Sequence, residues 1–432
     1  MALRRAGAEL TRRAVSAVAL RCVSTEARSA AAATSSAPAG ALVRGGSCAR
    51  KKVAWWLAGT AGWSLSLIAL GGVTRLTGSG LSMTSWRWVG ERPPLTDSDW
   101  QAELDAYRAS PEYRHHNRGI SLPQFKFIYW MEYAHRAWGR AMAAYFLLPA
   151  GYFAYRGFLT SKLFGRLALL FGAGASQAFV GWWMVRSGLE EPSEDSTVGS
   201  RVSPYRLASH LAAGATIYSG LVWTALDVAF PNSAAQQPGA PANSIVSAAK
   251  ARRMLIPLTT LICVTALSGA FVAGLDAGRA YNTIPLMNGQ LIPDDYWPNL
   301  QPWWRNMVES TSTVQLHHRA LAVSTLVATT ASWIASTRMV HLPHATRLCM
   351  HGLLGMTSMQ VTLGVSVLLT YVPISLGSLH QVGAFSLFTV ALAALHTTRL
   401  PSSAAVRAAS SAARKSASTS ASHSGSIAAA AA

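Results

Sequence analysis

Four of the twelve histidines occupy equivalent places in the two halves of the chain, each near the start of an even-numbered apolar segment: His135, His210, His318 and His380. Ionisable side chains are costly inside a membrane and usually serve a function, although a histidine can also simply hydrogen-bond a neighbouring helix. Two imidazoles on facing helices at one depth supply the two axial nitrogens of a six-coordinate haem iron. Because one pair lies in each half of the chain, the histidines predict two haem sites rather than one copper or non-haem iron centre with four ligands.

Glu132 lies three residues before His135 and therefore on the same face of a helix, whereas the equivalent position in the second half is Gln315. A carboxylate there can take up or give a proton, or stabilise positive charge that develops on a substrate. A carboxylate beside only one pair of histidines predicts that the first site carries out chemistry and the second does not. The alternative is an ion pair with Arg136 or Arg140.

Segments rich in small residues occupy equivalent places in the two halves, at residues 71–82 and 269–278. Glycine lets a bulky planar ligand approach the backbone closely, but small residues also pack membrane helices against each other. Four arginines near the outer boundary can either pair with haem propionates or anchor helices at the membrane surface: Arg75, Arg136, Arg279 and Arg319. Both features are compatible with haem binding without requiring it.

Helices in a membrane must position these residues. Of the 432 residues, 50% are apolar and only 13% are charged, against about 25% charged in soluble domains. Eight apolar runs are close to the roughly 20 residues that cross a bilayer, and in lipid such runs must be helical. They are residues 53–74, 128–155, 167–185, 205–226, 254–275, 314–337, 348–371 and 376–398. The sequence thus predicts an all-α polytopic membrane protein with eight transmembrane helices.

The two halves of the chain repeat one pattern. The matches include His135-Arg136-Ala137 with His318-Arg319-Ala320 at a shift of 183 residues, Gly71 with Gly269 at a shift of 198, and His210 with His380 at a shift of 170. We therefore expect two pseudo-symmetric four-helix bundles, related by an axis along the membrane normal. The bundles comprise residues 51–230 and 254–400, and a matrix loop at 231–253 joins them.

Basic residues outnumber acidic ones, 37 to 18. They prevail before the first span and in the loops after the second, fourth and sixth spans, whereas the alternate loops carry most of the acids. By the positive-inside rule both termini face the matrix and the acid-bearing loops face outward. Membrane topology thus accounts for the net charge of +19, and we expect no nucleic-acid partner. The four cysteines have no metal-like spacing and predict neither a zinc site nor a disulfide framework.

The two ends of the chain have biased compositions. Residues 1–50 hold eight arginines, no lysine and two acids among many alanines and serines. This is typical of an organellar transit peptide; we expect a mitochondrial one, with a plastid peptide or an ordinary disordered tail as alternatives. Residues 401–432 are Ala/Ser-rich and are predicted to be disordered. With the spans, these features predict a multi-pass protein of the mitochondrial inner membrane, surrounded by membrane lipid.

From about residue 53 to residue 398 the chain resembles heme A synthases, membrane enzymes that oxidise a ring methyl of haem O to the formyl of haem A for cytochrome c oxidase. The resemblance rests on GGVTRLTGSGLSM (71–83), EYAHRAWGR (132–140), VSPYRLASHL (202–211), VAGLDAGRAYNTIPLMNG (272–289), VQLHHR (314–319), QVTLG (360–364) and SLHQ (378–381). These motifs are ordered as in the mitochondrial branch. Two departures stand out: His317 directly precedes His318, and the outer loops lack the cysteine pair of some bacterial members.

The resemblance implies a role for each candidate residue. His135 and His210 would be the axial ligands of the substrate, haem O, and His318 and His380 those of a haem b cofactor. Glu132 would be the acidic residue important for catalysis. The resemblance also implies two protein partners, a ferredoxin that exchanges electrons and a haem O synthase that supplies the substrate.

Two other classes of protein compete with this interpretation. A diheme electron-transfer protein of cytochrome b type, linked to a quinol, also needs four intramembrane histidines, but histidines paired on the same two helices would favour it. Here each of four segments supplies one histidine, and Glu132 adjoins only the first pair. A transporter with internal repeats would have broken helices and polar groups near the middle of the membrane, whereas these histidines cluster toward one face.

Overall fold

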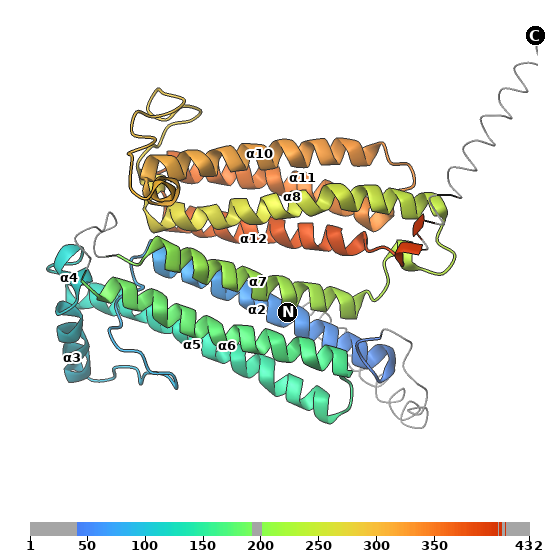
Figure 1. The fold of residues 1–432 in the computed structure, drawn as a ribbon. Coiled ribbons are helices and arrows are strands. Elements are labelled where there is room, and N and C mark those ends of the chain that lie inside the picture. Colours follow the sequence, from blue (N-terminus) through green and yellow to red (C-terminus); the bar gives the residue numbers. More distant parts are fainter. Residues whose placement is uncertain (1–40, 192–200, 405, 408–410, 412–432) are drawn as a thin grey trace, which may run out of the picture.

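The computed structural model describes residues 41–191, 201–404, 406–407 and 411 (Figure 1). Most of the predicted transit peptide and most of the predicted C-terminal tail lie outside these residues. Within the described part of the chain, every long regular element is an α-helix. The beginning of α2 and the end of α12, the first and last long helices, lie at the same end of the molecule (Figure 1).

The described residues include eight helices of 24 residues or more, and these form two groups (Figure 1). The first group consists of α2 (Gly46–Leu76), α5 (Leu122–Tyr155), α6 (Ser161–Leu189) and α7 (Pro204–Ala229). The second group consists of α8 (Ala242–Gly274), α10 (Thr311–Thr337), α11 (His344–Leu369) and α12 (Ile374–Thr397). The members of each group follow one another in the chain.

Seven of these described helices are long and apolar enough to cross a membrane. The exception is α5, because Lys126, Glu132, Arg136 and Arg140 lie along it and lower its mean hydropathy. It is nevertheless 34 residues long and packs alongside α2 and α6. The all-α polytopic membrane fold is confirmed, and the crossing of the membrane by α5, which would complete the eight, stays a prediction.

Short helices cover the same end of both groups (Figure 1). Between α2 and α5 lie α3 (Asp97–Arg108) and α4 (Pro111–His115). Between α8 and α10 lie η2 (Ala277–Arg279), η3 (Trp303–Arg305) and α9 (Asn306–Glu309). A capping box of Thr96 and Asp99 starts α3, which satisfies backbone N–H groups that a helix start leaves unpaired. We call this end, where the acid-bearing loops lie, the outer end.

The two groups meet where α2 and α7 contact α8 and α12. On α2 and α12 the side chains interlock through glycines, since a Cβ at Gly72 would lie 1.7 Å from Oε1 of Gln381, and a Cβ at Gly377 would lie 2.9 Å from Cδ1 of Leu76. Each glycine therefore receives a side chain of the other helix. This part of the glycine-rich segment at 71–82 serves helix packing.

At the opposite, inner end, a single carboxylate joins the two groups. Asp227 of α7 accepts hydrogen bonds of 2.6 Å from Arg166 of α6 and of 2.6 Å from Arg399, which follows α12. Its other neighbour is Nε2 of His396 on α12, at 3.2 Å. Because the Asp227 side chain is only 9% exposed, these partners balance a charge that would otherwise be buried alone.

The chain between the groups is more helical than the sequence suggested. After η1 (Ala234–Gln236), α8 begins at Ala242, so residues 242–253 of the expected matrix loop are helical. This stretch is rich in good helix formers, and its Ile245 and Ala248 are buried against Ala235. Val406 packs against the same cluster, although it belongs to the tail predicted to be disordered. Similarly, α2 begins at Gly46, within the expected transit peptide.

Candidate haem sites

The second histidine pair has the geometry of two axial ligands. His318 on α10 and His380 on α12 face each other with ring centroids 6.5 Å apart and ring planes at 82°. Two metal–imidazole bonds of about 2 Å each, together with the ring radii, place the centroids of two axial imidazoles about 6 Å apart. The two side chains therefore fit an iron between them.

Polar neighbours orient both of these rings. Oγ of Ser268, on α8, lies 2.6 Å from Nδ1 of His318. The Gln360 amide, on α11, lies 3.0 Å from Nδ1 of His380 and donates a hydrogen bond of 2.7 Å to the His380 backbone carbonyl. Such partners fix the orientation of metal-binding imidazoles. Since both Nδ1 atoms are engaged, the Nε2 atoms are the ones available to a metal.

Each of the four histidines packs against a glycine of a neighbouring helix. A Cβ built on the glycine would lie 3.1 Å from His135 at Gly71, 3.2 Å from His210 at Gly181, 3.5 Å from His318 at Gly269 and 2.9 Å from His380 at Gly364. A side chain at Gly71, Gly181 or Gly364 would crowd the imidazole, whereas one at Gly269 would make an ordinary contact with it. Both halves thus hold their histidines against glycines, which we call glycine notches, and the first pair, His135 on α5 and His210 on α7, shares this feature with the second.

The first pair has fewer polar restraints than the second. The Gln177 amide donates to the His210 backbone carbonyl at 2.7 Å, as Gln360 does to His380. However, Nδ1 of His210 is buried and has no hydrogen-bond partner among the described residues. Leu70 occupies the place that Ser268 has in the second half, at the same shift of 198 residues that pairs the glycines. The first-half imidazoles are held mainly by packing.

Glu132 is fully bonded within the protein. Its Oε2 accepts hydrogen bonds of 2.8 Å from Oγ of Ser82 and of 2.8 Å from the backbone N–H of Met83. Its Oε1 accepts one of 2.7 Å from Nη2 of Arg136. The ion pair with Arg136, which was the alternative to a chemical role for Glu132, is therefore present, whereas Arg140 has a different partner, Glu91.

A second buried carboxylate continues this network. Glu91, in the segment between α2 and α3, lies 3.2 Å from Nη1 of Arg136 and 3.2 Å from Nη2 of Arg140. Glu132, Arg136, Glu91 and Arg140 thus form a chain of alternating charges, which we call the acid–arginine chain. The side chains of Glu132, Arg136 and Glu91 are 3%, 5% and 6% exposed. Sequence reasoning missed Glu91, and its only signal was an acid in the first outer loop where the second half has Gly289.

Two of the four arginines suggested as partners of haem propionates, one in each half, donate hydrogen bonds to backbone carbonyls of an outer loop. Arg136 donates to the carbonyls of Ser85 and Met83 at 2.8 and 3.3 Å. Arg319 donates to those of Thr283 and Tyr281 at 3.0 and 2.8 Å. Thr283 and Tyr281 are equivalent to Ser85 and Met83 at the shift of 198 residues. The pseudo-symmetry inferred from the sequence therefore extends to side-chain contacts.

The other two arginines have different surroundings. Arg75 crosses between the groups to the carbonyl of Gly274 and the carboxylate of Asp276, at 3.2 and 3.3 Å. Arg279 is exposed at the outer end. A propionate partner for any of the four arginines stays a prediction.

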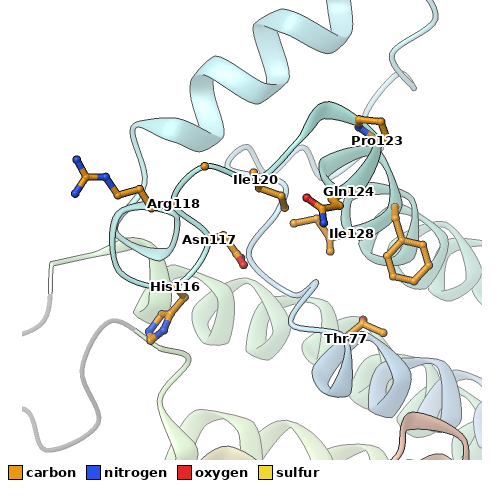
Figure 2. Close-up of a pocket in the computed structure, with 10 residues that line it drawn as sticks. Thr77, His116, Asn117, Arg118, Ile120, Pro123, Gln124 and Ile128 are labelled. Atoms are coloured by element: carbon orange, nitrogen blue, oxygen red, sulfur yellow. The ribbon is translucent and has the colours of Figure 1, made fainter.

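A cavity of about 640 Å³ lies at the outer end of the first group (Figure 2). It lies between the end of α2 and the start of α5 and is lined by Thr77, His116, Asn117, Arg118, Gly119, Ile120, Pro123, Gln124, Phe127 and Ile128. None of the predicted site residues lines it. Ile128 is one helical turn before Glu132 on α5, so the cavity lies outward of the acid–arginine chain.

No three histidines, cysteines or acids gather as a metal site in the part of the chain that the structure describes. The arrangement is instead two matched histidine pairs, one in each group of helices. Fold and site together define a class, polytopic membrane proteins with a pair of histidines in the helices of each half.

Comparison with known proteins identifies the family within this class. The chain belongs to the COX15-CtaA family of cytochrome oxidase assembly proteins, whose model matches residues 54–392. Among its relatives is a protein of Arabidopsis thaliana named heme A synthase COX15, which is 51% identical over 354 residues, or 81% of this chain and 75% of the relative. Proteins of the same name in Homo sapiens and Saccharomyces cerevisiae are 40% and 39% identical, over 80% and 79% of this chain and 82% and 74% of their own length.

Proposed function

We propose that this protein is a heme A synthase, which oxidises a ring methyl of haem O to a formyl group and so produces haem A. The observation that carries the proposal is the asymmetry of two otherwise matched sites. Both halves hold a histidine pair against glycines, but among the residues that the structure describes, buried carboxylates lie beside the first pair only. The relatives bear the name of this enzyme, and a protein that only transfers electrons has no need of that difference.

In this proposal His135 and His210 are the axial ligands of the substrate, haem O. Substrate must enter and product must leave, so the protein should hold the iron less firmly here than at a resident cofactor. The buried Nδ1 of His210 without a partner and the apolar Leu70 beside the glycine notch of His135 fit that requirement.

His318 and His380 are then the ligands of a resident haem b. Their opposed rings and the polar contacts of Ser268 and Gln360 suit a cofactor that stays bound. When bound, this group supplies one-electron transfer to or from the first site. The helices that carry the two sites touch directly, since α7, which carries His210, packs on α12, which carries His380.

Glu132 is the proposed proton acceptor of the reaction. Conversion of a methyl to a formyl group adds one oxygen, removes two hydrogens and withdraws four electrons, so protons must leave the reacting carbon. Oε1 of Glu132 is shared with Arg136, and Oε2 with Ser82 and Met83. A carboxylate held in this way keeps its negative charge at a fixed place, which suits it to stabilise positive charge on the substrate. It can receive a proton once it is released from Arg136.

Eukaryotic relatives and the apolar helices support a mitochondrial multi-pass membrane protein. We propose the inner membrane as its location, with both termini in the matrix and the histidines nearer the outer face. A ferredoxin as electron partner, a haem O synthase as source of substrate and contact with membrane lipid complete the proposal.

The test is haem extraction and chromatography from membranes that contain this chain together with a haem O synthase and the redox partner. The intact chain should yield haem A, and an empty vector should not. Glu132→Ala should keep both haems bound and yield no haem A. If the intact chain instead leaves haem O unchanged while it shows a bis-histidine b-type spectrum, the result would support an electron-transfer protein and refute the proposal.

A further inference from the structure

We propose that Glu91 is a positioning residue for the reaction, the counter-ion that keeps Arg136 paired whenever Glu132 turns from Arg136 to the substrate. This inference rests on the proposed function of Glu132. It concerns the part of the acid–arginine chain that the second half of the molecule lacks.

The geometry divides one guanidinium between two carboxylates. Nη2 of Arg136 donates to Oε1 of Glu132 at 2.7 Å, and Nη1 lies 3.2 Å from Oε1 of Glu91. The guanidinium also lies 4.4 Å from the ring centroid of Trp86, which covers one of its faces. Arg136 therefore still has a carboxylate partner, Glu91, when Glu132 leaves.

A buried arginine without a carboxylate is strongly unfavourable, because breaking a buried ion pair leaves a desolvated charge uncompensated. The Arg136 side chain is only 5% exposed, so Glu132 could not be released from it at low cost if it were the sole partner. Backbone carbonyls of Ser85 and Met83 satisfy N–H groups of Arg136 but carry no net charge. Glu91 supplies a negative charge that keeps Arg136 paired, so the release of Glu132 costs less free energy.

Glu91 is itself held in place. Its Oε1 accepts a hydrogen bond of 2.8 Å from the backbone N–H of Arg87, and its Oε2 lies 3.2 Å from Nη2 of Arg140. Arg140 also donates to the carbonyl of Arg87 at 2.9 Å. The segment around residues 87–91 is thereby fastened to α5, one turn beyond Arg136, and Glu91 stays beside Arg136 without help from Glu132.

The second half shows the equivalent site without the acid–arginine chain. There Arg319 bonds the equivalent loop carbonyls, but Gln315, Gly289 and Val323 stand where the first half has Glu132, Glu91 and Arg140. The loop contact of the arginine does not need the carboxylates. The added charges therefore belong to what only the first site does.

The experiment compares Glu91→Gln, Glu91→Asp and Glu132→Gln in the full-length protein with its haems. We expect Glu91→Gln to retain haem O binding and the b-type spectrum but to lose about 100-fold in turnover, with an unchanged KM, because Glu132 stays locked on Arg136. Glu91→Asp should restore most of that loss. Asp105→Asn removes an exposed acid from α3 and is the matched control, which should behave as wild type.

A thermal double-mutant cycle adds a readout independent of turnover. Each single variant, Glu91→Gln or Glu132→Gln, leaves Arg136 one carboxylate, whereas the double variant leaves none. The double variant should therefore lower the unfolding temperature by clearly more than the sum of the two single shifts. Additive shifts, or a Glu91→Gln enzyme with wild-type turnover, would overturn the role of Glu91. A Glu132→Gln enzyme with wild-type turnover would instead refute the proposed function of Glu132.

Discussion

Replacing Gly364 with alanine tests whether the glycine notches hold the histidines in position to bind a metal. A Cβ at residue 364 would lie 2.9 Å from Cε1 of His380. Carbon atoms in contact prefer about 3.5–4.0 Å, so the ring would have to withdraw by roughly 0.6 Å or more. Metal–ligand distances vary by only about 0.2 Å. The methyl group must therefore either move His380 out of its ligand position or distort α11.

The cost of such overpacking is about 1–3 kcal/mol, which corresponds to roughly 5- to 150-fold in a binding constant. We expect Gly364→Ala to weaken haem binding in the second half by a factor in this range. Titration of haem-depleted, purified protein with haem, followed by its absorption spectrum, measures the affinity.

Two alanine variants serve as controls. Gly355 lies on the same helix with no atom within 4 Å of an added Cβ, and an added Cβ at Gly269 would lie 3.5 Å from His318, an ordinary contact. Both Gly355→Ala and Gly269→Ala should bind haem as wild type does. A Gly364→Ala protein that binds haem as tightly as Gly355→Ala would refute the reasoning.

Two further predictions concern groups outside the histidine sites. Burial raises the pKa of Glu112, on α4, to about 7, against the attraction of Arg201 and Arg75. The folded protein thus binds this proton more tightly than the unfolded chain, and its stability falls as pH rises from 4.5 to about 7. Glu112→Gln should therefore gain up to about 3 kcal/mol over wild type between about pH 5 and about pH 8; an equal gap in unfolding temperature at both pH values would contradict this. Asp227→Asn should destabilise the folded protein by up to about 3 kcal/mol, since it leaves Arg166 and Arg399 without a carboxylate; an unfolding temperature equal to that of wild type would show that Asp227 does not join the two groups.

The arrangement of the helices and histidines was largely predictable, because it depends on patterns that the sequence shows directly. Apolar runs located the long helices, and the internal repeat paired His135 with His318 and His210 with His380. The repeat also paired Gly71 with Gly269, and both glycines receive a histidine in the structure. Such features follow from local composition and from a constant shift along the chain.

The acid–arginine chain was not predictable in the same way. Glu91 and Arg140 are 49 residues apart and meet only because the outer segment folds back onto α5. A polar loop has no periodicity that indicates which of its acids will be buried. The early start of α8 was missed for another reason: its first turns are polar enough for a loop, but Ile245 and Ala248 find a buried surface against η1.

The central claim is that the first histidine pair binds the substrate haem and the second pair binds the resident haem b. Optical spectra test it most directly. The protein would be purified from cells that lack a haem O synthase, as the His135→Ala/His210→Ala variant and as the His318→Ala/His380→Ala variant. We predict that the first variant keeps the bis-histidine b-type spectrum and the second loses it. A b-type spectrum that survives in the second variant and disappears in the first would contradict the assignment of the two sites.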